Sequence, residues 1–373
     1  MNPLLETVRL IPFLINGRVS QSCSQWPLFH ECQDPFQGTA PNEKQDHNHL
    51  GHKIRRQSQS QTTELKLGHY LLHEVIGSGG MGTVYLASDL CLQRQVAIKV
   101  LHDRLLSDPA LHHAFLREAR ACAALSHPHI ISIFSLEKVA GQSFLVMELA
   151  GGGNLHCRVK DEGPLPEWAV LDLGIKIASA LACALGKGIL HRDINPGNIL
   201  FCEEENPKLA DFGLAGSLQE LGESDTSLWA TPGYVAPEKV RGKRESFLSD
   251  LYSLAGTLYY AITGRVPFET NSVDALLLAH LHQPIPIARD ARSDISQLTS
   301  DVLVRAMAKN PHSRFRDYQD FISHLAFARQ QLQLPALGNQ NLPSSPVLVP
   351  KQNAKKWPWY HWFLPPGLAS RAT

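Results

Sequence analysis

One stretch of this sequence decides the fold: His191-Arg192-Asp193-Ile194-Asn195-Pro196-Gly197-Asn198, followed closely by Asp211-Phe212-Gly213. It brings two carboxylates and a carboxamide close together along the chain. Asp193 can accept a proton from an attacking hydroxyl group. Asn198 and Asp211 offer the oxygen ligands that hold Mg²⁺ against the phosphates of a nucleotide.

The composition bounds the class of protein. The chain has 373 residues, of which 43% are hydrophobic and 19% are charged, and its formal net charge is zero. This length allows one large domain, or two lobes, with a core of its own. The balanced charge predicts that nucleic acid is not a partner. No apolar run reaches the roughly 18 residues that a membrane-spanning helix needs.

The cysteines and the N-terminus indicate the compartment. The seven cysteines are scattered and odd in number, with no CxxC pair, which argues against a disulfide framework or a zinc site. Glu6 and Arg9 interrupt the apolar N-terminus, and no small-residue cleavage site follows, so a secretory signal is not expected. We therefore expect a reducing, cytoplasmic location.

The chain divides into three parts by composition. Residues 1–66 are rich in Gln, Ser, His, Asn and Pro, which predicts a disordered polar leader. Residues 67–330 show periodic structure, with strands first and helices afterwards. This order predicts an α+β fold, with a small β-rich lobe at about 67–150 on a larger helical lobe at about 151–330. Residues 331–373 form a Pro-rich tail with basic and aromatic residues.

Local patterns place the main elements. Clusters of β-branched and aromatic residues predict strands at 70–76, 84–87, 95–101 and 144–148. Apolar residues at helical spacing predict helices at 109–125, 168–185 and 251–262.

A glycine-rich turn lies between the first two predicted strands. Gly77, Gly79 and Gly82 fit the pattern G-x-G-x-x-G-x-V and would let the backbone approach phosphates. By itself the pattern also fits an ordinary glycine hairpin or a dinucleotide-binding turn. A strand follows the glycines instead of a helix, which disfavours the dinucleotide interpretation.

Two charged residues follow this turn at suggestive positions. Lys99 ends the apolar run Val96-Ala97-Ile98 on the next strand and is a candidate ligand for phosphates. Glu118 lies on the helix predicted at 109–125. It is either a surface glutamate or a partner that aims the Lys99 ammonium at the α- and β-phosphates.

The ordered set of motifs resembles the eukaryotic-type (Hanks-type) protein kinase family. It comprises the glycine turn, Val-Ala-Ile-Lys, a helix glutamate, His-Arg-Asp, Asp-Phe-Gly and Ala236-Pro237-Glu238. The phrases IGSGGMGTVYLA, FLREARACAALSHPHI and SDLYSLAGTLYYAITGRVPF are most similar to bacterial serine/threonine kinases. The resemblance covers about residues 68–330 and implies the bilobal protein kinase fold, with ATP in the cleft between the lobes.

The resemblance also implies roles at the matching positions. Asp193 would be the catalytic base, and Lys99 would contact phosphates with Glu118 as its partner. Asn198 and Asp211 would bind Mg²⁺, with Mn²⁺ as a second candidate. The residues that would bind ATP are Ile76, Gly77, Gly79, Gly82, Val84, Ala97, Lys99, Met147, Glu148 and Ala150. Three supporting contacts are implied as well: a stack of His191 with Phe212 and Cys122, a brace of the catalytic loop by Asp250, and an ion pair of Glu238 with Arg314.

Asn195 departs from the family pattern. Serine/threonine kinases carry a lysine two residues after the catalytic aspartate, where it contacts the γ-phosphate and bridges toward the threonine that is Thr231 here. Asparagine keeps a hydrogen-bond donor but loses the charge and the reach. By analogy with the loss of one oxyanion-hole donor, the rate would fall by on the order of 10²–10³. Another basic residue, for instance in the segment after Asp211, is the alternative source of this charge.

The implied function is transfer of the ATP γ-phosphoryl group to Ser or Thr hydroxyls of proteins, including this protein itself. Thr226 and Ser227 are the candidate acceptors in the activation segment, where a phosphate would engage Arg192. The rival interpretation is a pseudokinase or weakly active nucleotide-binding scaffold, because of Asn195. A small-molecule kinase of similar fold is disfavoured by the long activation segment.

The tail after Lys351 interleaves basic residues with tryptophan, tyrosine and phenylalanine. Such a mixture can dock on a membrane surface or a partner. The composition favours instead a disordered tail with a short cluster of aromatic and basic residues.

Overall fold

The structure of the protein is a computed structural model, which describes residues 65–79, 82–102, 109–202, 206–212 and 231–333. Most of the predicted leader, the tip of the glycine turn, Thr226 and Ser227, and the tail from residue 334 lie outside these residues.

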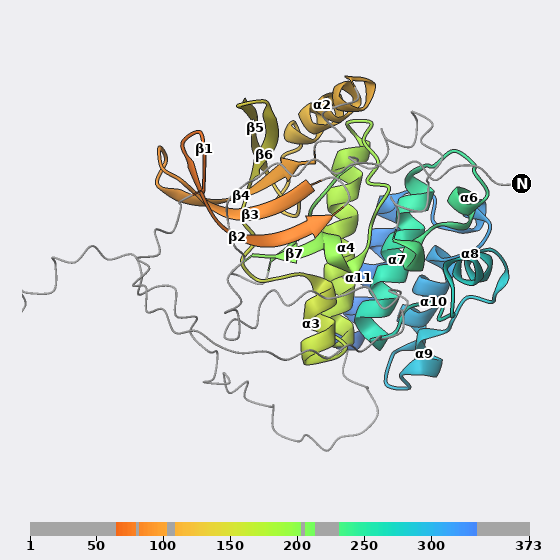
Figure 1. Ribbon diagram of the computed structural model, residues 1–373. Coiled ribbons are helices and arrows are strands. Elements are labelled where there is room, and N and C mark those ends of the chain that lie inside the picture. Colours follow the sequence, from red (N-terminus) through yellow and green to blue (C-terminus); the bar gives the residue numbers. More distant parts are fainter. Residues whose placement is uncertain (1–64, 80–81, 103–108, 203–205, 213–230, 334–373) are drawn as a thin grey trace, which may run out of the picture. The chain divides into compact units, whose positions relative to one another are not determined.

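The first described part of the chain forms a six-stranded antiparallel sheet. The strand order is β1-β2-β3-β4-β6-β5. The strands are β1 (Leu65–Leu67), β2 (Tyr70–Gly79), β3 (Gly82–Asp89), β4 (Arg94–Leu101), β5 (Ile133–Val139) and β6 (Gln142–Met147). Helix α2 (Pro109–Ala123) lies beside β5 and β6 (Figure 1). Phe115 and Ala119 of this helix are buried against Leu101 and Leu145 of the sheet.

Strand β4 is the strand that matters for the site. It lies between β3 and β6, so both of its edges are paired. Val96 and Ile98 are completely buried. This explains why β4 is a continuous apolar run where a half-exposed strand would alternate. The register sets Lys99 opposite Val84 on β3 and Leu145 on β6, so Lys99 enters the site from a rigid strand.

The second part is mostly helical. Its helices are α3 (Leu155–Glu162), α4 (Glu167–Leu185), α6 (Pro237–Val240), α7 (Phe247–Thr263), α8 (Val273–His282), α9 (Ala288–Ala291), α10 (Gln297–Ala306) and α11 (Tyr318–Gln333). Short 3₁₀ turns are η1 (Pro196–Asn198), η3 (Pro232–Tyr234) and η4 (Pro311–Ser313), and β7 (Ile199–Phe201) pairs with β8 (Pro207–Leu209). Figure 1 shows the helices gathered on one side of the sheet, which matches the predicted bilobal α+β fold.

Helix α7 is the centre of the helical lobe. Most of its residues are buried, and it contacts α4 and α10. It begins at a capping box in which Ser246 and Ser249 satisfy each other's backbone N–H groups. It ends at Gly264, whose φ of 73° is a left-handed conformation that glycine adopts without strain. Both ends of α7 are therefore fixed by local sequence.

Helix α4 lies where a helix was predicted, but its length and apolar composition were not expected to suit a membrane-spanning helix. By length and composition it would qualify as a membrane-spanning helix, although Asp172 and Lys176 interrupt its apolar residues. Half of its most apolar window is buried inside the domain, where α4 packs on α11 and α7. At Gly174 an added Cβ would lie 2.9 Å from side chains of both partner helices. In this structure α4 therefore serves as a close-packed core helix.

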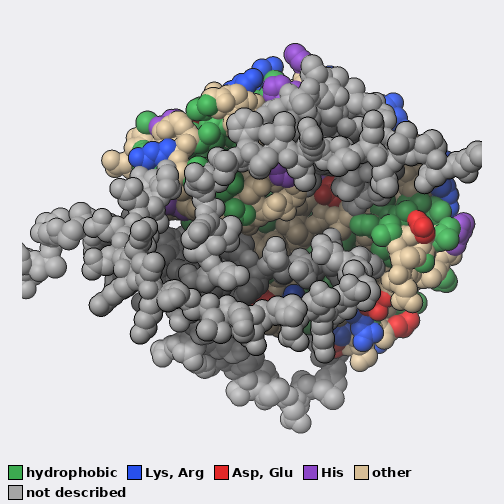
Figure 2. Space-filling view, viewed as in Figure 1, with side chains coloured by type: hydrophobic (Ala, Val, Ile, Leu, Met, Phe, Trp, Pro, Cys, Tyr) green, Lys and Arg blue, Asp and Glu red, His purple; other side chains and the backbone are tan. Residues whose placement is uncertain are grey.

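The predicted elements are confirmed to within a few residues at their ends. The strands β1, β5, β7 and β8 were not predicted from the sequence. Helix α11 continues to Gln333, three residues beyond the expected end of the domain. Figure 2 shows acidic and basic side chains mixed over the described surface of one face, without a patch of one sign.

A buried ion pair ties the helical lobe together. Arg314 donates to Glu238 at 2.7 Å and 2.8 Å, and Ser249 donates to the same carboxylate at 2.8 Å. Arg314 is 3% exposed and Glu238 is 6% exposed. Burial alone would raise the pKa of Glu238, but the hydrogen bonds and charge of Arg314 lower it below its ordinary value. The predicted structural pair is confirmed.

The substitution Glu238→Gln should lower the free energy of unfolding by about 3–5 kcal/mol at neutral pH, since it leaves a buried guanidinium without its counter-charge. Because folding lowers the pKa of Glu238, the pair stabilises the fold above the ordinary carboxyl pKa of about 4.3. That contribution is lost as the pH falls through the folded-state pKa. Urea unfolding across this pH range, with the exposed Glu162→Gln as control, checks this. An equal effect of the two variants would contradict it.

Candidate active site

Lys99 joins the sheet to the helical lobe. Its ammonium nitrogen lies 2.7 Å from Oδ1 of Asp211, and the residue is only 5% exposed. Glu118 lies partly buried on α2, and its expected pairing with Lys99 stays a prediction. The described partner of Lys99 is thus a carboxylate of the helical lobe, one that the family resemblance implies as a metal ligand.

Asp211 is held in its charged form. Desolvation would raise its pKa, but the charge and hydrogen bond of Lys99, together with His191, lower it below the ordinary value. The backbone of Asp211 has a φ of 58°, a left-handed conformation that residues other than glycine rarely adopt. Such strain persists only where the surrounding structure imposes it, and it concentrates at functional sites.

The loop that carries Asp193 is anchored to α7 by hydrogen bonds to Asp250. The backbone N–H groups of His191 and Arg192 each donate to the Asp250 carboxylate at 2.8 Å. Arg192 has a φ of 70°, so this loop also contains a left-handed residue. Asp250 is 3% exposed. Burial raises its pKa, although His191 and the two N–H donors oppose this. The predicted brace is confirmed.

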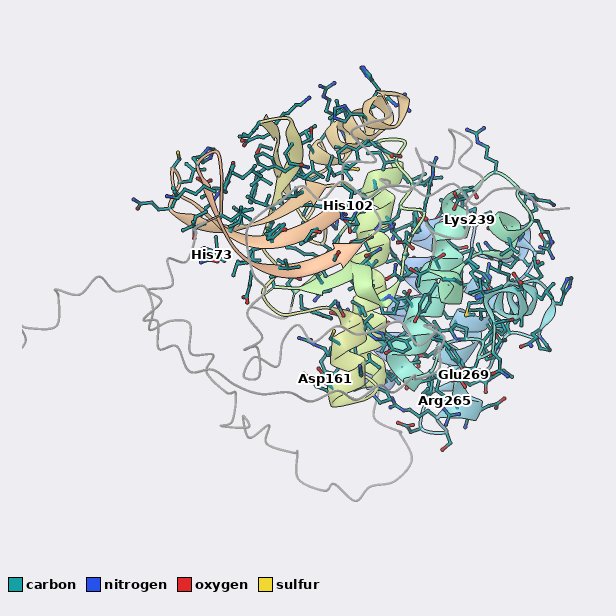
Figure 3. All side chains as sticks on the ribbon, viewed as in Figure 1. His73, His102, Asp161, Lys239, Arg265 and Glu269 are labelled. Atoms are coloured by element: carbon teal, nitrogen blue, oxygen red, sulfur yellow. The ribbon has the colours of Figure 1, made fainter. Side chains whose placement is uncertain are left out.

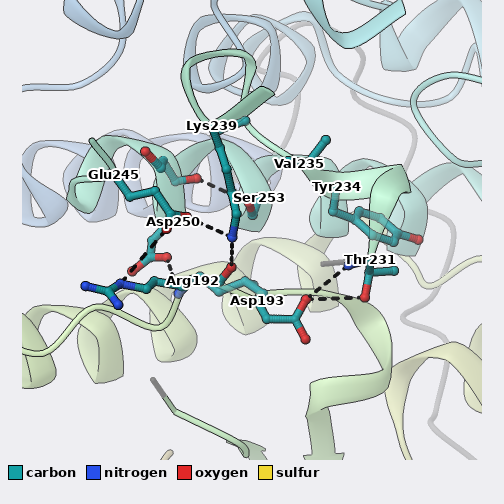
Figure 4. A pocket seen from close by; sticks show the side chains of 12 residues that line it. Arg192, Asp193, Thr231, Tyr234, Val235, Lys239, Glu245, Asp250 and Ser253 are labelled. Carbon is teal, nitrogen blue, oxygen red and sulfur yellow. Dashed lines mark hydrogen bonds and ion pairs between the residues drawn. The ribbon is translucent and has the colours of Figure 1, made fainter. Parts of the chain in front are cut away.

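Both oxygens of Asp193 are engaged. Oδ2 accepts from the Asn198 amide at 3.1 Å. Oδ1 lies 3.3 Å from the Thr231 hydroxyl and 3.4 Å from the Thr231 backbone nitrogen (Figure 4). Thr231 therefore contacts the carboxylate directly, without a bridging lysine. The carboxylate is held in place but keeps lone pairs for a substrate hydroxyl.

Asn198 and Asp211 are the residues that could hold a divalent cation. The Asn198 side-chain nitrogen donates to Asp193, so its oxygen faces the other way. The Asn198 carbonyl accepts from the N–H of Ala210 at 2.9 Å, which places Asn198 beside the residue before Asp211. A charged carboxylate and a carboxamide oxygen are ligands that suit Mg²⁺.

Asn195 folds back onto its own loop. Its side-chain oxygen accepts from the N–H groups of Gly197 at 2.8 Å and Asn198 at 3.3 Å. Its side-chain nitrogen donates to the carbonyl of Asp193 at 3.2 Å. Asn195 is 7% exposed. All three bonds go to loop backbone, so the side chain does not reach outward as a substitute for a catalytic lysine would.

A buried contact joins the two lobes behind the site. The ring of His191 lies 4.7 Å from that of Phe212, and the Cys122 thiol donates to the Phe212 carbonyl at 3.3 Å. Burial raises the pKa of Cys122 to about 12, so the thiol keeps its proton and remains a donor. The predicted grouping of these three residues is confirmed, with a hydrogen bond in place of a purely apolar contact at Cys122.

The expected adenine site has an apolar wall. Ala97 on β4 lies opposite Met147 on β6 in the sheet register, and Val84 on β3 lies opposite Gly77 on β2. Ile76 precedes Gly77 on β2 and is partly buried. These positions suit packing on an aromatic ring. A separate apolar cavity of about 20 Å³ also adjoins Met147, but Cys122, Leu145 and Phe212 line it, and the other expected adenine contacts do not.

The segment after β6 offers hydrogen bonds to a base. Among the described residues, the carbonyl of Glu148 and the N–H of Ala150 have no backbone partner. The Glu148 side chain accepts from the Ser132 N–H at 3.1 Å and pairs with Lys208 at 2.8 Å. Glu148 is thus anchored by its side chain, so any contact with a nucleotide base comes from its backbone.

The glycines of the turn serve different purposes. At Gly82 an added Cβ would lie 2.2 Å from the carbonyl oxygen of Val100, so the close approach of β4 requires glycine there. At Gly79 no atom of the described residues lies within 4 Å of the added Cβ. The expected approach to phosphates therefore remains open at Gly79. The need for glycine at position 82 comes from strand packing instead.

A second group of charges was not found from the sequence. Lys239 donates to the Arg192 carbonyl at 3.0 Å and pairs with Glu245 at 3.0 Å, while Glu245 lies 4.0 Å from the Arg192 guanidinium (Figure 4). These residues line a cavity of about 10 Å³ beside Asp193. Figure 3 places Lys239 among the helices, away from His73 on the sheet. Its position directly after Ala236-Pro237-Glu238 was the available signal.

The comparisons with known proteins agree with this geometry. Residues 70–326 match the model of the protein kinase domain. Serine/threonine-protein kinase PrkC of Bacillus subtilis is 36% identical over 254 residues, which cover 68% of this chain and 39% of PrkC. Serine/threonine-protein kinase PknE of Mycobacterium tuberculosis is 33% identical over 304 residues, which cover 79% of this chain and 53% of PknE.

A solved structure gives the same picture. The PknI kinase domain of Mycobacterium tuberculosis matches with a TM-score of 0.58 and 28% identity, covering 71% of this chain and 98% of that domain. The chain spans between about two fifths and one half of the length of the two curated relatives named above. Motifs, fold and relatives lead to one conclusion: this chain belongs to the protein kinase family.

Proposed function

We propose that this protein transfers the γ-phosphoryl group of ATP to serine or threonine hydroxyls of proteins. One observation carries the proposal. Thr231 and Asn198 hold the two oxygens of Asp193, while the Asn198 backbone is paired beside Asp211, the partner of Lys99. These contacts bring a candidate base, two candidate metal ligands and a buried cation together from three separate segments, which supports the proposal because the reaction requires all three.

Asp193 would orient the substrate hydroxyl and take its proton. As the oxygen attacks the γ-phosphorus, the bond between this phosphorus and the β-phosphate oxygen breaks, and ADP leaves. The Asp193 oxygens already have fixed directions in the folded loop, so little reorganisation is needed. A divalent cation at Asn198 and Asp211 would supply positive charge to the phosphates. We propose Mg²⁺, with Mn²⁺ as a second candidate.

Lys99 would contact the phosphates, and Glu118 would help to orient it. The ammonium is buried on β4 and already paired with a carboxylate, so it enters the cleft from the sheet side. The adenine would pack between Val84, Ala97 and Met147. It would bond to the free backbone groups of Glu148 and Ala150.

The choice of serine and threonine rests on two supports. The relatives are named serine/threonine-protein kinases. Thr231 also lies against the oxygen of Asp193 that a substrate hydroxyl would approach. The scaffold interpretation has no specific support among the relatives. The cysteines that the structure describes are all free, which fits the proposed cytoplasmic location.

Purified full-length protein should incorporate label from γ-labelled ATP with Mg²⁺ into itself and into a generic serine/threonine substrate. Phosphoamino-acid analysis should find phosphoserine or phosphothreonine. Asp211→Asn should lose at least about two orders of magnitude in rate, since a charged metal ligand disappears. The exposed Asp274→Asn on α8 is the matched control and should behave like wild type. Equal incorporation by wild type and Asp211→Asn would refute the proposal.

The protein should also phosphorylate its own activation segment at Thr226 or Ser227. The double variant Thr226→Ala/Ser227→Ala should lower substrate phosphorylation by about tenfold or more, because one charge-assisted hydrogen bond to Arg192 contributes about 1.5–3 kcal/mol. The control is Ser217→Ala/Ser224→Ala, which removes two other hydroxyls of the same segment. If the first double variant is as active as wild type, this switch does not exist.

A further inference from the structure

Asn195 has the geometry of a helix cap. It precedes η1 with φ −152° and ψ 166°, an extended conformation, and Pro196 follows at the first position of the turn. The side-chain oxygen accepts from the next two available N–H groups, those of Gly197 and Asn198. The N–H of Gly197 would otherwise lack a partner, because the first donors of a helical turn have none within it. The N–H of Asn198 is shared between the side-chain oxygen of Asn195 and the backbone carbonyl of Asn195, which lies 3.1 Å away.

The chain contains a second turn of the same kind. Asn310 precedes η4, Pro311 follows it, and the side-chain oxygen of Asn310 accepts from the N–H of His312 at 3.1 Å. This turn lies between α10 and α11. The pair shows what an Asn-Pro sequence does in this protein apart from any catalytic role.

The first turn differs from the second in what it carries. Asn198 stands at its third position, and the N–H that Asn195 caps belongs to Asn198 itself. The Asn198 amide then donates to the carbonyl of Asp193 at 2.8 Å, and the Asn195 amide donates to the same carbonyl at 3.2 Å. Asn195 therefore fixes both the backbone of Asn198 and the acceptor that orients its side chain.

The packing around Asn195 is close. An added Cβ at Gly197 would lie 3.0 Å from the Asn195 side-chain oxygen, so a larger residue at position 197 would push the capping oxygen from its place. Lysine carries donors only and has no acceptor for the N–H groups of Gly197 and Asn198. In this loop a lysine at position 195 would lose the cap that asparagine provides.

We propose that Asn195 is a positioning residue: its carboxamide orients Asn198 and Asp193 and thereby sets the affinity of the site for its divalent cation. This inference rests on the proposed function. Asn195 then has a structural role of its own and is more than a poor replacement for the lysine found at this position in related kinases.

The test measures the Mg²⁺ concentration at half-maximal effect in two ways: for phosphoryl transfer, and for equilibrium binding of a fluorescent ADP analogue. Asn195→Ala and Asn195→Lys should raise it by about tenfold or more, the range seen when residues that orient metal ligands are removed. Asn195→Ser keeps a neutral capping oxygen and should stay within about threefold of wild type.

Two controls separate positioning from general destabilisation. Asn310→Ala removes the equivalent cap at η4 and should leave the Mg²⁺ dependence unchanged. Gly197→Ala should raise the Mg²⁺ requirement when Asn195 is present, because the new methyl group displaces the cap. It should add little when combined with Asn195→Ala. This coupling is expected only if the two residues act through one contact.

The outcomes are distinct. If Asn195→Lys transfers phosphate as well as wild type or better, with an unchanged Mg²⁺ requirement, the inference is overturned and position 195 merely lacks a catalytic cation. If wild type binds the nucleotide in an Mg²⁺-dependent way but transfers nothing, the proposed kinase function fails, and the binding measurements still decide the role of Asn195. Nucleotide binding that ignores Mg²⁺ in wild type overturns the inference itself.

Discussion

The site depends on one interaction, the pair of hydrogen bonds from the backbone of His191 and Arg192 to the carboxylate of Asp250. Asp250 stands in the first turn of α7, a helix capped at Ser246 and buried along most of its length. A loop would otherwise have to pay for its own order in conformational entropy. Here it takes its position from a helix that is buried along most of its length. The carboxylate of Asp193 and everything that bonds to it follow from that anchor.

Two further contacts connect this ordered loop to the sheet side. The Lys99–Asp211 pair and the Cys122–Phe212 hydrogen bond cross from the sheet side to the helical side. They meet the loop where Ala210 bonds to the Asn198 carbonyl. The left-handed backbone at Asp211 lies where these contacts meet. Such a conformation persists only where the surrounding structure imposes it.

The parts that the sequence predicted share a physical basis. The buried strand β4 and the helix α7 depend on residue type and periodicity, which a single chain displays. The Glu238–Arg314 pair was instead implied by the resemblance to the protein kinase family. The features that were not predicted depend on the orientation of side chains in the folded protein and on contacts between distant segments. The residue types around Asn195 do not show that its side chain bonds to the backbone of its own loop. The need for glycine at position 82 follows only from the close approach of the Val100 carbonyl oxygen. Strand β5 and the short hairpin β7–β8 were not predicted for a related reason, since their pairing partners define them.

The anchoring of Glu148 has a consequence for motion. Its side chain is tied to Lys208 and to the backbone of Ser132. At the other end of the connection between the lobes, Gly152 donates to the Phe201 carbonyl at 2.8 Å, and an added Cβ at Gly152 would lie 2.8 Å from the same oxygen. We expect any opening or closing of the cleft to concentrate its rotation in Leu149 to Gly151, because hinges concentrate rotation in a few residues. The fixed contacts on both sides of this stretch would keep such a rotation short.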